Sequence, residues 1–358
     1  MVIYICIALF LYATRYSNKK SIVLFAFFIL VFVAGFRDIT VGRDTQNYLS
    51  RYERGYDFES IFLVREGTHE IFYNSLFAFS NYWGLSYQNV LLIQAVLFLS
   101  LLYFFFNKKQ STPLLGLFVF YMLYNYMHFL NVSRQMISVA LCSFAYLFIE
   151  DIFNERKIAL KKLNAKSISK ALCFIGIVFL SLLIHSSSVL MLLLIPLLFV
   201  DIKITSWSIA LVLSLFVGWR LDLSSYLQEY AILFGVADVY SNYFERVDTF
   251  FPIGNAMNTI VFIMLYWRYR DVINFDKNIY MKAWYISIII MNLFAFTSEW
   301  IGRATFCFTI GCCVIIPMCL ESKRDAIGSS VIYLYLLVSF FKELLRGVDG
   351  ILPYNFCF

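Results

Sequence analysis

Long apolar runs alternate with short polar connections along almost the whole chain. Runs of this length and composition predict helices that are long enough, or nearly long enough, to cross a membrane. The predicted spans cover residues 2–14, 21–36, 86–106, 111–130, 132–149, 168–184, 186–200, 205–220, 255–271, 281–298, 301–320 and 327–345. This pattern predicts an all-α membrane protein with about twelve transmembrane helices.

The composition agrees with that class. Of the 358 residues, 61% are hydrophobic and 15% are charged, which is more apolar surface than a soluble domain could bury. The first run, Val2–Thr14, has no basic region before it and no small-residue cleavage site after it, so we interpret it as a span rather than a signal peptide. No internal repeat interrupts the chain, and we expect one integral membrane domain over residues 1–358.

The positions of lysine and arginine predict the orientation, because short loops that are rich in them stay in the cytoplasm. Basic residues follow spans one, three, five, nine and eleven, which fall on one side if both termini lie outside. This count requires that the short amphipathic stretch 70–83 does not cross, so we predict a re-entrant or surface helix there. Two longer connections, residues 37–69 and 221–254, then lie outside.

Several kinds of chemistry find no support in the sequence. The eight cysteines show no metal-ligand spacing, and no H-E-x-x-H or D-x-D pattern occurs, so we predict no metal site and no cofactor. There is no G-x-x-x-x-G-K-[ST] loop for a nucleotide. The net charge of +6 is explained by cytoplasmic loops rather than by a nucleic-acid partner.

The unusual polar residues gather on the predicted outer face. Phe36–Tyr48 reads F-R-D-I-T-V-G-R-D-T-Q-N-Y, with two arginines and two aspartates beside an apolar run. Arg134 lies in the first turn of another apolar helix, where a charge is costly and therefore indicates function. A planar guanidinium near a helix N-terminus suits phosphate, so the pattern favours an anionic ligand.

Simpler readings exist for each of these residues. Arg134 would also be stable if its side chain extended to the outer interface without a ligand. Either Arg37 or Arg43 could pair with Asp38 or Asp44 and only shape the loop. His185, which three serines follow, could be a turn histidine. The many aromatic residues suit membrane belts better than sugar stacking.

The motifs resemble a known family. F-R at Phe36–Arg37, G-R-D-T-Q-N-Y at Gly42–Tyr48, N-V-S-R-Q at Asn131–Gln135, H-S-S at His185–Ser187 and G-R-A-T-F at Gly302–Phe306 are similar to the EpsG-like branch of bacterial Wzy-type polysaccharide polymerases. The resemblance implies a GT-C-type glycosyltransferase in the bacterial inner membrane, with its site facing the periplasm or exterior. It implies a metal-independent transfer of glycan from an undecaprenyl-diphosphate-linked donor to a lipid-linked acceptor, within the bilayer, with a chain-length regulator as a further partner.

The resemblance also implies roles for residues of this chain. Diphosphate binding falls to Arg37, Arg43, Arg134 and Arg303. Catalysis falls to Arg134, to His185 as general base, and to Asp44 as the second choice of base. Substrate contacts fall to Tyr48, Gln135, Arg246, Glu299 and Tyr354. In the late G-R-A-T-F element, Cys307 stands where an aromatic residue is expected, which weakens the assignment of Arg303.

Two other functions remain open at this point. An O-antigen ligase would use the same donor chemistry. A transporter or flippase of lipid-linked sugars would need a charged path through the bilayer, whereas the inner halves of the predicted spans carry few ionisable residues.

Overall fold

The apolar runs form helices in the computed structural model, which describes residues 1–59, 61, 71–156, 165–200, 204–221, 223, 251–271, 273–274, 278–295, 299–322, 325–347 and 349–358. Within these ranges the only β-type pairing is an isolated antiparallel bridge between Arg37 and Phe356. The all-α class is therefore confirmed for the described part of the chain.

The chain divides into two compact units, and each is described on its own. The first comprises Met1–Ile149, Lys162–Val189 and Tyr333–Phe358, and the second comprises Glu150–Lys161 and Leu190–Ile332.

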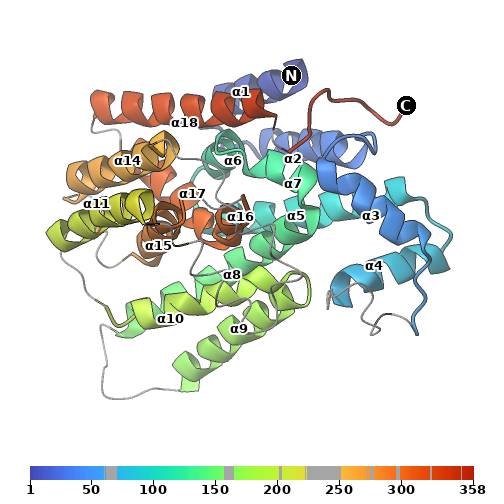
Figure 1. Ribbon diagram of the computed structural model, residues 1–358, viewed down its shortest axis with the longest axis horizontal. Coiled ribbons are helices and arrows are strands. Elements are labelled where there is room, and N and C mark those ends of the chain that lie inside the picture. Colours follow the sequence, from blue (N-terminus) through green and yellow to red (C-terminus); the bar gives the residue numbers. More distant parts are fainter. Residues whose placement is uncertain are drawn as a thin grey trace. The chain divides into compact units, whose positions relative to one another are not determined.

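The first unit is built from helices around α2 and α5, which lie side by side (Figure 1). Its helices are α1 (Val2–Thr14), α2 (Lys20–Gly35), α3 (Arg43–Glu53), α4 (Ile71–Tyr82), α5 (Tyr87–Lys109), α6 (Pro113–Met122), α7 (Asn125–Asn131), the start of α8 (Ser133–Arg156), α9 (Ala165–Leu182) and the end of α18 (Ala326–Arg346). Pro113 occupies the first turn of α6, where its missing N–H costs no hydrogen bond. The helix α5 ends with Lys108 and Lys109, whose positive charges interact favourably with the negative end of the helix dipole.

The second unit is built around α15, which packs against α17 and α11. Its helices are α10 (Leu194–Leu197), α11 (Ile204–Arg220), α14 (Ile253–Tyr269), α15 (Ile279–Leu293), α16 (Glu299–Ala304) and α17 (Phe306–Glu321). Gly311 lets α17 approach α15 closely, because a Cβ there would overlap the carbonyl oxygen of Tyr280. The buried ammonium of Lys282 donates to Leu197 O at 2.9 Å and Val200 O at 2.8 Å, which satisfies carbonyls at the end of α10.

Every predicted span coincides with helical structure, but three spans are each divided into two helices, one of them 301–320, which is α16 followed by α17. The run 111–130 is two helices, α6 and α7, that meet at a bend of 63°. The run 186–200 is a 3-10 helix, Ser186–Leu193, followed by α10. The predicted outer loop 37–69 contains a polar helix, α3, and the stretch 70–83 is α4, as expected from its amphipathic pattern.

Helices long and apolar enough to cross a membrane are fewer than the predicted spans. Among the described residues three qualify: Tyr87–Lys109, Ser133–Ile152 and Ala326–Arg346. The bent pair α6 and α7 would be a fourth if it forms one broken span. Shorter apolar helices include α1, α2, α15 and α17. The structure is therefore compatible with a membrane protein, and the number of spans stays a prediction.

Two packing features position the polar residues of the first unit. A buried aromatic cluster joins α3, α4 and α5, with Tyr48, Tyr73, Phe77 and Tyr87 among its members. The C-terminal segment, residues 349–358, returns along the end of α2 (Figure 1). Its backbone binds there through Asp38 N to Asn355 O at 2.9 Å and Cys357 N to Phe36 O at 3.1 Å.

Candidate active site

The break between α6 and α8 brings polar side chains together in the first unit. Tyr124 has a left-handed backbone with φ of 69° and separates α6 from α7. The two helices meet at a bend of 63°, and only Val132 separates α7 from the start of α8. Arg134 and Gln135 consequently lie in the first turn of α8, as the sequence predicts.

Arg134 lies against two tyrosine rings. Its Cζ is 4.8 Å from the ring centroid of Tyr48 on α3 and 5.7 Å from that of Tyr73 on α4. A guanidinium at these distances is attracted by the negative face of the ring. Tyr48, which we expected to contact substrate, is thus a buried partner of Arg134.

Tyr73 is a member of the site that sequence analysis missed. It is fully buried, its hydroxyl accepts a hydrogen bond from Gln94 Nε2 at 2.8 Å, and it lies 3.1 Å from Ser133 Oγ at the start of α8. The available signal was the helical spacing of Tyr73 and Phe77 on the buried face of α4. Tyr73 links α4 and α5 to the start of α8.

Arg37 is the most deeply buried cation of the group. Only 1% of its surface is exposed, and Nη1 donates to Ala34 O at 2.6 Å. Its Nε and Nη2 have no hydrogen-bond partner among the described residues. Burial lowers the pKa of Arg37, and tyrosines rather than carboxylates surround it: Tyr73, Tyr87, Tyr126 and Tyr354.

The loop-shaping alternative for Arg37 is wrong. The Asp38 carboxylate instead accepts hydrogen bonds from Thr40 N at 2.9 Å and Thr40 Oγ1 at 2.7 Å. These bonds hold the pKa of Asp38 below its ordinary value. Within the described residues no carboxylate lies at ion-pair distance from Arg37, so its charge has no protein counter-ion there.

The turn that carries His185 is held against α8. Gln135 Nε2 donates to Ser187 Oγ at 3.1 Å, and Ser188 Oγ donates to the His185 carbonyl at 2.8 Å. Ser138, one turn further along α8, contacts Ser188 through its hydroxyl. Burial, together with the charge of Arg134, lowers the pKa of His185 to about 4. Three residues predicted from sequence, Arg134, Gln135 and His185, therefore lie together.

The lowered pKa predicts an acid-sensitive stability. Because the folded state disfavours protonated His185, the unfolded chain takes up a proton as the pH falls below its ordinary value of 6.5, and the folded protein does not until about pH 4. The free energy of unfolding should therefore fall by about 2 kcal/mol between pH 7 and pH 5. Thermal midpoints of wild type and His185→Gln across this range measure the effect, since the variant should lose less. An equal decline in both proteins would contradict the assignment.

The start of α3 has a structural role. Gly42 N and Arg43 N donate to the carbonyls of Gly350 and Asp349 at 2.9 and 3.0 Å, and Asp44 N donates to Asn131 Oδ1 at 2.9 Å. These amides are thus used within the protein rather than for an anion. The Arg43 side chain is exposed and has no carboxylate at ion-pair distance among the described residues.

Tyr354 is also explained by internal contacts. Its hydroxyl donates to Val33 O at 2.6 Å, and its ring lies edge-on to Tyr4 with centroids 5.6 Å apart. It secures the C-terminal segment to α2 beside Arg37.

The comparison with known protein families agrees with these motifs. Residues 20–356 match the EpsG family. The chain belongs to the EpsG family. No curated protein and no solved structure matches it. Membership supports a polysaccharide polymerase-like membrane protein with glycosyltransferase character.

A second feature that sequence analysis missed in this EpsG-family chain is a buried carboxylate. Asp349 is 2% exposed, and its Oδ1 accepts a hydrogen bond from Asn131 Nδ2 at 2.7 Å. Its Oδ2 lies 2.8 Å from Nδ1 of His128 on α7. An aspartate in the turn after a long apolar helix was the available signal.

The remaining predicted residues are not among the described residues of the first unit. Arg303 and Glu299 belong to α16 of the second unit. Arg246 lies outside the described residues. In the described ranges no group of three or more His, Cys, Asp or Glu side chains is arranged to hold a metal ion.

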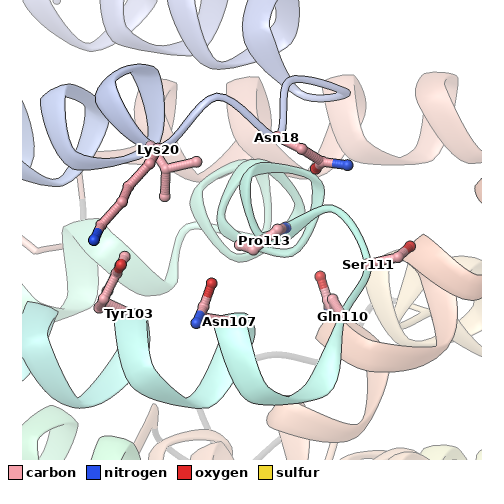
Figure 2. A pocket seen from close by; sticks show the side chains of 8 residues that line it. Asn18, Lys20, Tyr103, Asn107, Gln110, Ser111 and Pro113 are labelled. Atoms are coloured by element: carbon pink, nitrogen blue, oxygen red, sulfur yellow. The ribbon is translucent and has the colours of Figure 1, made fainter.

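A pocket of about 450 Å³ lies between the N-terminal end of α2 and the C-terminal end of α5 (Figure 2). Its lining is polar, and Lys20 is its one charged residue: Asn18, Lys20, Val23, Tyr103, Asn107, Gln110, Ser111 and Pro113. The sequence assigns this lysine-rich end to the cytoplasm. Arg37 follows the other end of α2, so the pocket is separate from the candidate active site.

Proposed function

We propose that this EpsG-family chain is a polymerase that joins undecaprenyl-diphosphate-linked oligosaccharide repeat units. In this proposal the chain is a GT-C-type protein of the bacterial inner membrane with about twelve spans, and its site faces the periplasm or exterior. The product is O-antigen, capsule or exopolysaccharide. The proposal includes a chain-length regulator as a protein partner.

The observation that carries the proposal is the buried guanidinium of Arg37. A buried charge without a counter-ion is costly, and a bound anion removes that cost. The diphosphate of a lipid-linked glycan supplies such an anion in a chain whose family membership supports polysaccharide polymerisation. Arg134, held by tyrosine rings at a helix start, would supply the second guanidinium.

The reaction uses the arginines to stabilise the leaving group. The oxygen of an acceptor hydroxyl attacks the anomeric carbon of the donor sugar, and the bond from that carbon to the phosphate oxygen breaks. The electron pair leaves with the undecaprenyl diphosphate, where the guanidinium groups of Arg37 and Arg134 oppose the developing negative charge. Arg43, exposed at the start of α3, and Arg303 of α16 are further candidates for diphosphate contact.

Elongation with purified protein tests this function. Wild type, supplied with lipid-linked repeat units in detergent or vesicles, should form new glycosidic bonds and longer glycans. Arg134→Ala should lower the rate by about a hundredfold. Arg134→Lys keeps the charge without the planar guanidinium, so its elongation rate should lie between those of wild type and Arg134→Ala.

Each alternative function has its own outcome in this assay. A transporter or flippase would move lipid-linked sugars and form no glycosidic bond. A ligase would transfer the glycan only when lipid A core is added. Unchanged polymer length with Arg134→Ala, in cells where the protein reaches the membrane, would remove the role given to Arg134.

A further inference from the structure

A buried carboxylate–imidazole pair joins α7 to the C-terminal segment. Asp349 Oδ2 and His128 Nδ1 are 2.8 Å apart, which is ion-pair distance if the imidazole is protonated. His128 keeps 22% of its side chain exposed, whereas the Asp349 side chain keeps 3%. The aspartate is therefore enclosed, and the imidazole is its more accessible partner.

Asp349 is held firmly by groups other than His128. Asn131 Nδ2 donates to Oδ1 at 2.7 Å, and Asn131 Oδ1 in turn accepts from Asp44 N at 2.9 Å. The backbone carbonyl of Asp349 accepts from Arg43 N at 3.0 Å. These bonds fix the carboxylate, and its second oxygen lies at ion-pair distance from Nδ1 of His128.

This geometry selects one form of the histidine. A carboxylate beside Nδ1 favours the neutral tautomer with its proton on Nδ1, and Nε2 is then the basic nitrogen. The same carboxylate stabilises the imidazolium that forms when Nε2 takes a proton. His128 and Asp349 thus have the relation that a histidine base requires.

Chain neighbours of the pair contact arginines of the proposed diphosphate site. The ring centroid of Phe129, the next residue of α7, lies 5.9 Å from Cζ of Arg37. Gly350, next to Asp349, packs against the Arg43 side chain so closely that a Cβ would lie 2.7 Å from Arg43 Cγ. Arg134 follows on the same stretch of chain, at the start of α8.

His185 is less suited to taking a proton. Burial and the nearby charge of Arg134 both oppose its protonated form and hold its pKa at about 4. A base must stabilise the proton that it receives, and the surroundings of His185 do the opposite. His128, by contrast, has the enclosed carboxylate of Asp349 2.8 Å from its Nδ1.

We propose that His128 is the proton acceptor of the transfer reaction and that Asp349 positions it, an inference that rests on the proposed polymerase function. As the acceptor oxygen bonds to the anomeric carbon, its proton passes to Nε2 of His128. The bond from the anomeric carbon to phosphate breaks, and its electron pair leaves with the diphosphate. The imidazolium, held by Asp349, later releases its proton to water.

Two ionisable groups lie directly beside His128: Asp349 of the C-terminal segment and Tyr124 before α7. Glu343 of α18 acts electrostatically on Tyr124, and Arg43 and Asp44 of α3 are linked to Asp349 through its backbone carbonyl and through Asn131. Of these, Asp349 is the one whose carboxylate lies at ion-pair distance from the imidazole. Removal of the Asp349 charge should therefore lower the rate more than removal of the Glu343 charge.

The elongation assay with full-length protein tests the pair. His128→Gln should lower kcat more than a hundredfold with little change in KM, and His185→Gln should lower it less than tenfold. Asp349→Asn should lower kcat and leave KM within twofold of wild type, while Asp349→Glu should recover part of the rate. Glu343→Gln, a change of the same kind on α18, should leave both kcat and KM within twofold of wild type.

Rescue separates proton transfer from a structural effect. His128→Gly should regain elongation when imidazole is added to the assay. A His128→Gly protein with wild-type KM and thermal midpoint, which imidazole does not rescue, would overturn the proposal. So would a His128→Gln protein that elongates at the wild-type rate, while the polymerase function would stand. If wild type forms no glycosidic bond, the polymerase function itself is wrong.

Discussion

Replacing Arg37 by methionine should leave the protein folded, with a thermal midpoint at least equal to that of wild type, and lower elongation by a hundredfold or more. The guanidinium is 1% exposed, and Nε and Nη2 lack a hydrogen-bond partner among the described residues. Methionine fills a similar volume without a buried charge, so the free energy of unfolding should not fall. The rate should fall because a group that stabilises the leaving diphosphate is gone.

Arg15 provides a matched control in the same unit. Its Nε donates to Tyr333 Oη at 2.9 Å, and its Cζ lies 3.7 Å from the ring centroid of Tyr12. Arg15→Met removes these contacts, so it should lower the thermal midpoint and leave elongation unchanged.

The two variants are thus expected to show opposite signatures in thermal unfolding and in the elongation assay. An Arg37→Met protein that loses stability and activity together would show that Arg37 is structural. An active Arg37→Met protein would remove it from the site.

The helices were largely predictable because the length of each apolar run sets where a helix can form. Their interruptions were not. Tyr124 adopts a left-handed conformation that most sequences reserve for glycine or asparagine, so the bend between α6 and α7 carries no local signal. The helix α3 is polar, and its packing against α7 through Thr45, whose hydroxyl lies 3.4 Å from Leu130 O, is a tertiary effect.

Residues of the candidate site were predictable from sequence where a charged residue interrupts an apolar run, because burying such a charge is costly. Arg134 stood out in an apolar helix, and the structure brings it to His185 as expected. The buried partners were not predictable, because Tyr73 and Asp349 acquire their roles from residues far away in the sequence. Sequence analysis also placed Tyr354 with the substrate, whereas its hydroxyl binds the α2 backbone.

The position with the largest expected effect on folding of the site is Gly42, where α3, α7 and the C-terminal segment meet. Its φ of 94° lies in a region that side chains strongly disfavour. A Cβ there would overlap the carbonyl oxygen of Leu130 and lie 3.1 Å from Asn131 Cα. The Thr45 hydroxyl would also lie 2.8 Å from this Cβ, but the two α7 neighbours are backbone atoms, and Asn131 is the residue that holds Asp44 N and Asp349. Relief of the overlap must therefore move α7 away from α3.

Gly42→Ala should destabilise the protein by about 3 kcal/mol or more, from backbone strain together with overpacking, and abolish elongation. Gly55→Ala separates the two causes, because Gly55 also has a positive φ, of 69°, but nothing lies within 4 Å of its Cβ position. That variant should lose only about 1 kcal/mol from strain and keep its activity. Thermal midpoints in detergent and elongation rates measure both variants. Equal losses in the two would show that strain alone matters, and that the close contact of Gly42 with α7 does not hold the site together.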